Sequence, residues 1–394
     1  MSCFQSWSKS GAWGLAAVSL AALAACGGGG GGDANAATPS NFAQGSIEGF
    51  GSIIVNGVRY DETQARVSSD EGATLASEAL KLGMVVEVLA SAPTASPTGL
   101  PTAKASAVRT RSEVEGPLTA IAGDMLTVLG QSVRLTPATF FDDDLVNGRT
   151  SLAVGQRLEV YGHVGQDGVL TATRIDLEDD TDDYKLRGTV TALDPVNRTF
   201  NIGGATLSYA SLATQPALAE GQVVDVRVAT GQQGGAWVLT RLRAPTSLVA
   251  GQSLKAELEG VVSEVIYQGA QIMGLVVNGV RVDTGSVTLP VGLAQGNLVE
   301  VEGRLHDGVL TASKVEREQR LDGDEGFEVQ GRITALDTVQ KTFELRGVKV
   351  KYNDSTRFED GGLAQLALNA KVEVSATLEA DGRTLLATEV EFDD

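Results

Sequence analysis

The sequence predicts an all-β protein in which five small five-stranded barrels follow one another along the chain. Three observations carry this prediction. A repeat recurs about every 70 residues, its segments alternate apolar and polar residues, and turn dipeptides stand where hairpins require them.

Two signatures recur once in each module. A glycine follows a charged or polar strand start, at intervals of 67, 72, 72 and 71 residues. These glycines are Gly49, Gly116, Gly188, Gly260 and Gly331. The second signature reads LKLGMVVEV, LAVGQRLEV, LAEGQVVDV, LAQGNLVEV and LALNAKVEV, and it places one acidic residue at a shared position. These acids are Glu87, Glu159, Asp225, Glu300 and Glu373.

Two pairs of modules align without a gap. GTVTALDPVNRTFNIGGATLSY, which begins at Gly188, matches GRITALDTVQKTFELRGVKVKY, which begins at Gly331, and Phe200 and Tyr209 fall on Phe343 and Tyr352. VNGVRYD and VNGVRVD, which end at Asp61 and Asp283, match in the same way. Matches of this length indicate duplicated structural units.

Each unit has the strand order of a small Greek-key barrel. Period-two alternation predicts half-buried strands, and Asn-Gly or Asp-Gly dipeptides predict tight hairpin turns between the second and third and between the fourth and fifth strands. A less regular segment between the third and fourth strands, such as 360–369, could hold one helical turn. Three strands, a short helical link and two strands are the order of the OB-fold; the alternative is a simple meander or half of a sandwich.

These features set the expected boundaries. We expect a signal peptide at 1–25, a Gly-rich tether at 26–44, and modules at 45–111, 112–180, 184–245, 255–318 and 327–394. Acidic linkers at 178–183 and 316–325 separate two pairs of modules. A unit of about 65 residues without disulfides is near the limit of independent stability, which favours packing of adjacent modules; modules that swing freely are the alternative.

The N-terminus indicates export. Lys9 is followed by a short apolar run and then by Leu23-Ala24-Ala25-Cys26, with six glycines after the cysteine. This arrangement resembles the lipobox of bacterial lipoproteins, which implies that Cys26 is acylated and anchors the mature chain to a membrane. Gly27 implies sorting to the outer membrane, on its periplasmic leaflet or at the cell surface. Signal cleavage elsewhere, with Cys26 incidental, is the alternative.

Composition narrows the function classes. The chain contains 31 basic and 50 acidic residues, with a net charge of −19, and this disfavours a nucleic-acid partner because phosphate binding needs a basic surface. Beyond the predicted signal, Cys26 is the one cysteine and Trp237 the one tryptophan. A disulfide, a cysteine nucleophile and a platform for stacking bases or sugars are therefore not expected.

The repeated signatures also resemble a known family. The opening GFGSIIVNGVRYD, which comes after the lipobox, and the recurring GxVTALD and LxxGxxVEV patterns are similar to proteins built from the bacterial domain family of unknown function numbered 5666. The resemblance covers nearly all of the mature chain. It implies an exported protein of tandem small β-domains and implies no activity.

No candidate catalytic residue stands out. His163 and His306 lie near hairpins of two different modules and not at matching positions, so we interpret both as surface histidines beside turns. The repeated acid at Glu159 and its counterparts is interpreted as a solvent-facing charge that discourages edge pairing, with paired-acid catalysis as the alternative.

Two further segments are candidate sites. Asp179, Asp180, Asp182 and Asp183 could bind Ca²⁺ and stiffen a joint between modules, although a solvated linker explains them equally simply. The segment SAPTASPTGLPTAKAS at 91–106 is an insertion between two strands of the first module. It is either a recognition loop or a proline-rich excursion without a ligand.

The sequence therefore predicts a lipid-anchored envelope protein that acts without catalysis or cofactor, as a binding or spacer protein. Its expected partners are the membrane, through Cys26, and an envelope protein or polysaccharide. The alternatives are a carboxylate-dependent hydrolase in one diverged module and a rod stiffened by calcium.

Overall fold

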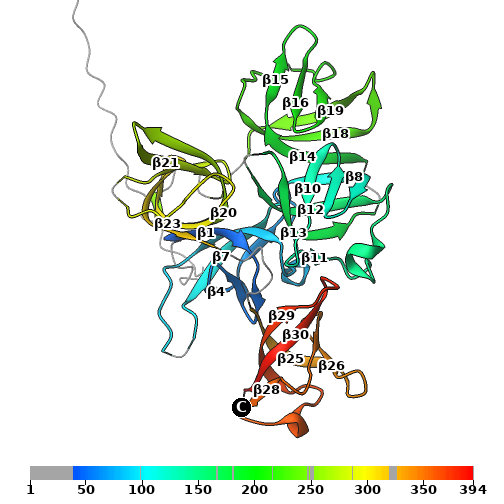
Figure 1. Ribbon diagram of the computed structural model, residues 1–394, viewed down its shortest axis with the longest axis vertical. Coiled ribbons are helices and arrows are strands. Elements are labelled where there is room, and N and C mark those ends of the chain that lie inside the picture. The colour runs from blue at the N-terminus through cyan, green and yellow to red at the C-terminus, as the bar shows by residue number, and fades with distance from the viewer. Residues whose placement is uncertain are drawn as a thin grey trace, which may run out of the picture. The chain divides into compact units, whose positions relative to one another are not determined.

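A computed structural model describes residues 39–393 apart from 98, 166, 180–181, 215, 246–247, 249–252, 286 and 319–325 (Figure 1). The predicted signal, Cys26 and most of the tether lie outside the described residues. The described chain consists of strands and short 3₁₀ helices, and within it no helix is long and apolar enough to cross a membrane. The predicted all-β fold with small five-stranded barrels is confirmed.

The strands fall into groups that we number barrel 1 to barrel 5 in chain order. Barrel 1 contains β1 (Asn41–Ser46), β2 (Gly49–Phe50), β3 (Ile53–Val55), β4 (Val58–Asp61), β5 (Arg66–Ser68), η1 (Ser77–Ala79), β6 (Val85–Ala90) and β7 (Thr102–Thr110). Barrel 2 contains β8 (Val114–Ala122), β9 (Met125–Val128), β10 (Gln131–Arg134), β11 (Phe140–Phe141), η2 (Gly148–Ser151), β12 (Arg157–Val164) and β13 (Leu170–Leu177). Barrel 3 contains β14 (Asp183–Thr189), β15 (Thr191–Asp194), β16 (Thr199–Ile202), β17 (Ala205–Ser208), β18 (Val223–Gln233) and β19 (Ala236–Arg243).

The remaining strands form the last two groups. Barrel 4 contains β20 (Ser253–Gln268), β21 (Gln271–Val277), β22 (Val280–Asp283), β23 (Leu298–His306) and β24 (Val309–Arg317). Barrel 5 contains β25 (Phe327–Asp337), β26 (Thr342–Leu345), β27 (Val348–Lys351), β28 (Arg357–Glu359), η4 (Leu363–Gln365), β29 (Lys371–Leu378) and β30 (Thr384–Phe392).

The strand pairing is that of an OB-fold and excludes a simple meander. In barrel 4, β20 pairs with β21, β21 with β22, β22 in parallel with β24, β24 with β23, and β23 again with β20, which closes the ring. The same parallel pairing of the third and fifth strands occurs in the other barrels, as β4–β7, β10–β13, β17–β19 and β27–β30. The helical link predicted before the fourth strand is present as η1, η2 and η4.

The turn residues act as their chemistry predicts. Asn56-Gly57, Asn278-Gly279 and Asp307-Gly308 all have positive φ at both positions, as type I′ hairpin turns require. The aligned repeats also pack alike. The ring centroids of Phe200 and Tyr209 lie 6.1 Å apart at an interplanar angle of 37°. Those of Phe343 and Tyr352 lie 6.2 Å apart at 35°. The gapless sequence match therefore reflects the same core geometry.

Neighbouring barrels are joined through their first strands. β1 pairs in parallel with β20, β2 in parallel with β25, and β8 antiparallel with β14. Barrel 1 also shares one apolar cluster with barrel 5, and Phe140 and Tyr161 of barrel 2 belong to that cluster. The barrels are therefore packed against one another, as their small size predicts.

The expected starts of two modules are corrected. Strand β1 begins at Asn41 and pairs with β6 from there, so residues 41–44 are part of barrel 1 and not of a tether. Strand β20 begins at Ser253, two residues before the expected start of the fourth module. In both cases the added residues pair with the fourth strand of their own barrel, so the first strand is longer than the repeat signature indicates.

Candidate functional site

The repeated acid and the repeated glycine belong to one structural feature. In each barrel the acid of the fourth strand lies directly opposite the residue that precedes the glycine in the first strand. The pairs are Gln44–Glu87, Glu115–Glu159, Arg187–Asp225, Glu259–Glu300 and Gln330–Glu373. Gly45, and not Gly49, is therefore the counterpart in barrel 1, and it lies 71 residues before Gly116. The expectation for Gly49 was wrong because the first strand of this barrel continues as β2.

The repeated acids do not face solvent, so that interpretation was wrong. Glu87 and Asp225 are buried, and Glu159, Glu300 and Glu373 are half-buried. The reason is that the first and fourth strands form the face through which the barrels meet. Neighbouring chain segments therefore cover a position that an isolated barrel would expose.

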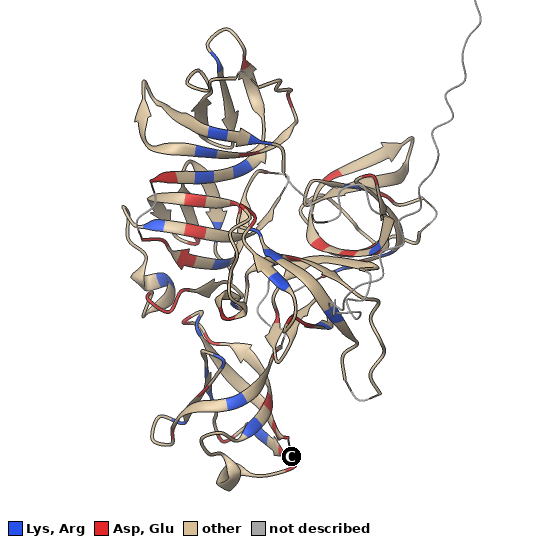
Figure 2. Ribbon diagram, turned by 180° about the vertical axis from the view of Figure 1, so that it is seen from behind, with Lys and Arg blue, Asp and Glu red and all other residues tan. Residues whose placement is uncertain are grey.

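A row of six charged side chains crosses barrels 2 and 3 where β8 and β14 pair. Successive cross-strand neighbours in this charged row are Arg241, Arg227, Lys185, Glu115, Glu159 and Asp176. Cross-strand neighbours share a face of the sheet. The basic bands of β14, β18 and β19 therefore adjoin the acidic bands of β8, β12 and β13 (Figure 2). The sheet carries three cations followed by three anions.

The connection between barrels 1 and 2 lies beside this row and is itself buried. Ser112 accepts a hydrogen bond from Lys185 at 2.7 Å and donates one to Glu159 at 2.6 Å. Arg111 lies 3.4 Å from Glu113 and 3.8 Å from Glu87, and its guanidinium also donates to the Asn278 carbonyl of barrel 4 at 3.4 Å. Ion pairs thus fix the connection of these two barrels.

Barrels 1 and 5 meet through two arginines. The Arg59 guanidinium binds Glu328, donates to Glu373 at 2.6 Å, and lies 3.5 Å from the amide oxygen of Gln330. In the opposite direction, Arg346 binds Glu62 of barrel 1 at 3.1 Å and lies over the Phe50 ring at 5.4 Å. The repeated acid Glu373 therefore serves as a junction residue between barrels.

Burial, together with neighbouring acids, raises the pKa of three carboxyl groups near these junctions. Burial raises the pKa of Asp176 to about 6 although Arg174 opposes the shift, and burial together with Glu159 and Glu115 raises the pKa of Glu178 to about 7. In barrel 4, burial and the neighbouring Glu300 raise the pKa of Glu257 to about 9. These carboxyls hold a proton at a higher pH than free acids do.

The two histidines have different environments. His306 is exposed and lies 3.3 Å from Asp307 at its turn, as predicted. The prediction for His163 was wrong, because its side chain is 1% exposed and its Nε2 lies 3.8 Å from Glu259 of barrel 4. Glu259 also accepts from the backbone N–H of Ser46 in barrel 1 at 3.4 Å. His163 is thus a junction residue where three barrels meet.

The predicted calcium ligands are not brought together in the part of the chain that is described. Asp183 binds Arg227 at 3.2 Å and accepts from Thr240 at 3.2 Å, while the backbone carbonyl of Asp179 accepts from Arg157 at 3.0 Å. Asp182 is exposed, and Asp180 lies outside the described residues. Among the described residues no group of three or more His, Cys, Asp or Glu side chains is arranged to hold a metal ion.

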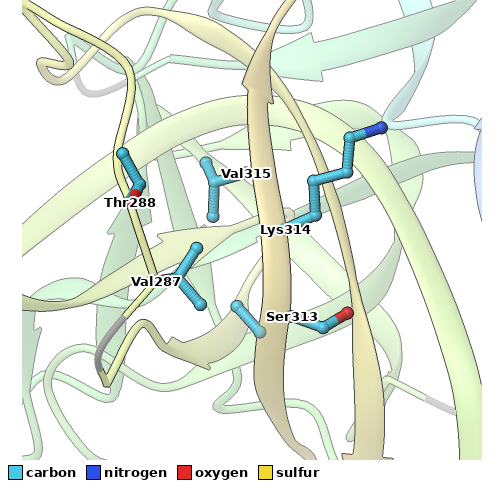
Figure 3. Close-up of a pocket in the computed structure, with 6 residues that line it drawn as sticks. Val287, Thr288, Ser313, Lys314 and Val315 are labelled. Carbon is cyan, nitrogen blue, oxygen red and sulfur yellow. The ribbon is translucent and has the colours of Figure 1, made fainter.

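Two other surface features are plain in the structure. The proline-rich insertion forms a long connection between β6 and β7, and Thr94 and Thr102 pair within it. An open hollow in barrel 4 is lined by Val287 and Thr288 on one side and by β24 on the other (Figure 3). Its one charged lining group, the Lys314 ammonium, is bound to Glu302 at 3.0 Å and to Glu316 at 3.1 Å. The lining of the hollow is therefore more polar than apolar, and its ammonium is already paired.

The cationic partners of the acids at the barrel junctions were not predicted from the sequence. Arg59, Lys185 and Arg227 belong to barrels other than those of several acids they bind, and no spacing rule connects them. The one usable signal was the repeated acid itself. Its partners differ from barrel to barrel, so the repeat did not reveal them.

Comparison with known proteins gives one family. The model of a domain of unknown function (DUF5666) matches residues 115–176, 259–316 and 330–391. These segments correspond to most of barrels 2, 4 and 5. No curated protein matches the chain.

Among solved structures, a multidomain protein with nucleic acid binding domains from Streptococcus pneumoniae is 14% identical. The match covers 52% of this chain and 73% of that one, with a TM-score of 0.16.

Proposed function

We propose that this chain, three segments of which match the model of the domain family DUF5666, is a non-catalytic scaffold of the bacterial cell envelope. In this proposal Cys26 is acylated and anchors the chain to the outer membrane. The packed barrels then present their outer hairpins to an envelope protein or polysaccharide.

One observation carries the proposal. In three barrels the recurring acid contacts a residue outside its own barrel. Glu373 binds Arg59 of barrel 1, Glu87 lies 3.8 Å from Arg111 of the connection at 111–113, and Glu159 accepts a hydrogen bond from Ser112 of that connection. A carboxylate that is already bonded to a neighbouring side chain is poorly placed to attack or protonate a substrate. The recurring acids therefore support a structural role more than a catalytic one.

The same observation favours a compact scaffold over a flexible spacer. Pairing of first strands, together with the buried residues Arg111 and His163, ties barrel 1 to barrels 2, 4 and 5. A scaffold with fixed joints presents several binding elements at once and gains avidity without ordering a linker.

The test is in-cell crosslinking followed by affinity recovery of the lipidated protein, with Cys26→Ala as the matched unanchored form. We expect one envelope protein or glycan to be recovered from the anchored form and lost from the variant. Its binding to the purified chain is then measured directly. Empty recovery from both forms, with the lipidated protein shown to be at the outer membrane, would contradict a partner-binding scaffold.

A further inference from the structure

The basic half of the charged row is filled by an acidic turn from a different barrel. The turn at 69–72 follows β5 of barrel 1 and brings Asp70 and Glu71 to barrel 3. Glu71 accepts from Nε and Nη2 of Arg227 at 2.9 and 2.6 Å, and it also binds Arg241. Asp70 binds the Lys185 ammonium.

The contact has the geometry of a recognition site for an acidic peptide. Arg227 donates to the Glu71 carboxylate through two nitrogens. This bidentate arrangement gives arginine its specificity for carboxylates. Arg243 donates to the backbone carbonyl of Asp70 at 2.9 Å, so the site also contacts the peptide chain that bears the acids. This last contact distinguishes a peptide from a sugar acid or a free anion.

The three basic side chains of the row lie close enough to repel one another. Lys185, Arg227 and Arg241 are direct cross-strand neighbours, and like charges in that position destabilise a sheet. Glu115 and Asp183 neutralise part of this charge, because they lie 3.0 and 3.2 Å from Arg227. The remaining basic charge is met by the turn of barrel 1.

The turn is built so that it can leave without unfolding its barrel. Its backbone bonds run within the turn, from Gly72 to the Ser69 carbonyl and from Ser69 to the Ala73 carbonyl, at 3.0 and 2.9 Å. The site is also open on one side, since the side chains of Glu71 and Arg241 are 25% and 48% exposed. Solvent and an external chain can therefore reach it.

We propose that barrel 3 carries a binding site for an acidic peptide segment with adjacent carboxylates, and that the Asp70–Glu71 turn is its built-in competitor. Lys185, Arg227 and Arg241 bind the two carboxylates, and Arg243 binds the peptide carbonyl. An external segment gains access by displacing the turn. Because the contacts are ionic, binding of that segment weakens as the salt concentration rises. This site is independent of the membrane anchor.

The experiment measures the fluorescence anisotropy of a labelled peptide with the sequence of residues 66–75, RVSSDEGATL, titrated with the full mature chain. The chain carrying Asp70→Asn and Glu71→Gln keeps the turn and loses its charges, so the site becomes free. We expect it to bind the peptide at least about tenfold more tightly than the unaltered chain, because an attached competitor acts at a local concentration in the millimolar range. Adding Arg227→Gln and Arg241→Gln should abolish this binding.

The controls separate recognition from general electrostatics. The control variant Glu78→Gln with Glu264→Gln removes an equal number of negative charges, at two exposed positions. Its affinity for the peptide should equal that of the unaltered chain. A peptide with Asn-Gln in place of Asp-Glu should not bind. If the double variant does not fold, Glu71→Gln alone frees the guanidinium of Arg227. This variant is expected to bind the labelled peptide more tightly than the unaltered chain, by a smaller factor than the double variant. Equal affinities for the freed and unaltered chains, or binding that survives loss of both arginines, would overturn the proposal.

Discussion

At the scale of single residues, the most informative position is the acid that recurs in every barrel. Sequence periodicity places Glu159 and its counterparts on the outer face of a strand, and that placement is right for a barrel taken alone. In the structure most of these acids meet an arginine or a hydroxyl, which in some barrels belongs to another barrel or to the connection at 111–113. Periodicity records which face a residue is on and does not record what covers that face.

Glu257 shows what crowding of such acids does to stability. Burial and Glu300 raise its pKa to about 9, well above the value in the unfolded chain. The folded protein then holds a proton that the unfolded chain releases, and stability falls as pH rises from about 5 to 9. We expect Glu257→Gln to have little effect at pH 5 and to increase the free energy of unfolding at pH 8 by at least about 1 kcal/mol. Denaturant titrations at the two pH values measure both.

Glu264→Gln is the matched control for that experiment, since Glu264 is exposed on the same strand β20. Its effect should be small and equal at both pH values. An equal effect of Glu257→Gln at pH 5 and pH 8 would show that its carboxyl does not retain a proton in the folded state.

At the scale of strands and turns, local sequence was enough to predict most of the fold. Alternation, Asn-Gly turns and the repeat period predicted the strand order and the link before the fourth strand. The exceptions are the start of barrel 1 at Asn41 and the true repeat glycine, Gly45. Both lie in a first strand that divides its pairing between its own barrel and two others, and such pairing leaves no local signal.

The repeated glycine has a steric reason that can be tested in barrel 3. A Cβ on Gly188 would lie 2.3 Å from Cγ2 of Ile202, whose side chain is 2% exposed and has little room to move. We therefore expect Gly188→Ala to lower the free energy of unfolding by about 1–3 kcal/mol. Chemical denaturation followed by circular dichroism measures the loss.

Gly231 provides the control within the same barrel. A Cβ there meets nothing within 4 Å, so Gly231→Ala should be neutral or slightly stabilising. If the two alanine substitutions cost the same, crowding against Ile202 is not the reason for the glycine.

At the scale of the whole chain, the barrels depend on one another for cover. Each barrel is too small for a large core. Strand pairs and ion pairs between barrels supply the stabilisation that a single small core lacks. The small size of the modules favoured packing between them, but the sequence left freely swinging modules open. It could not predict which modules meet, because barrel 1 contacts barrels that lie more than 200 residues along the chain.

The linker at 111–113 is the first place where this dependence can be measured. Arg111 is buried between Glu87 and Glu113, and Arg111→Gln removes one buried cation from each, leaving Glu87 with Arg109 and Glu113 with Arg187. Complete loss of the partner from a buried pair costs about 3–5 kcal/mol, so we expect a smaller loss of about 1–3 kcal/mol, measured by calorimetry of the full chain. Arg134→Gln is a suitable control because its pair with Asp167 is half exposed, and it should change stability by less than about 1 kcal/mol. Equal losses would mean that the linker pairs contribute no more than surface pairs.

The junction of barrels 1 and 5 offers the sharper test of mutual support. Arg59 joins Glu328 and Glu373 with 14% of its side chain exposed, so Arg59→Gln leaves two half-buried acids without their cation. We expect a loss of about 2 kcal/mol and faster amide hydrogen exchange in β25 and β29, with β8 and β12 unchanged. Lys341→Gln, which removes an exposed pair with Asp354 inside barrel 5, should leave the exchange in β25 as it was. Faster exchange throughout barrels 2 and 3 as well would mean that the chain unfolds as a single unit, whereas no change in β25 would mean that barrel 5 is stable without barrel 1.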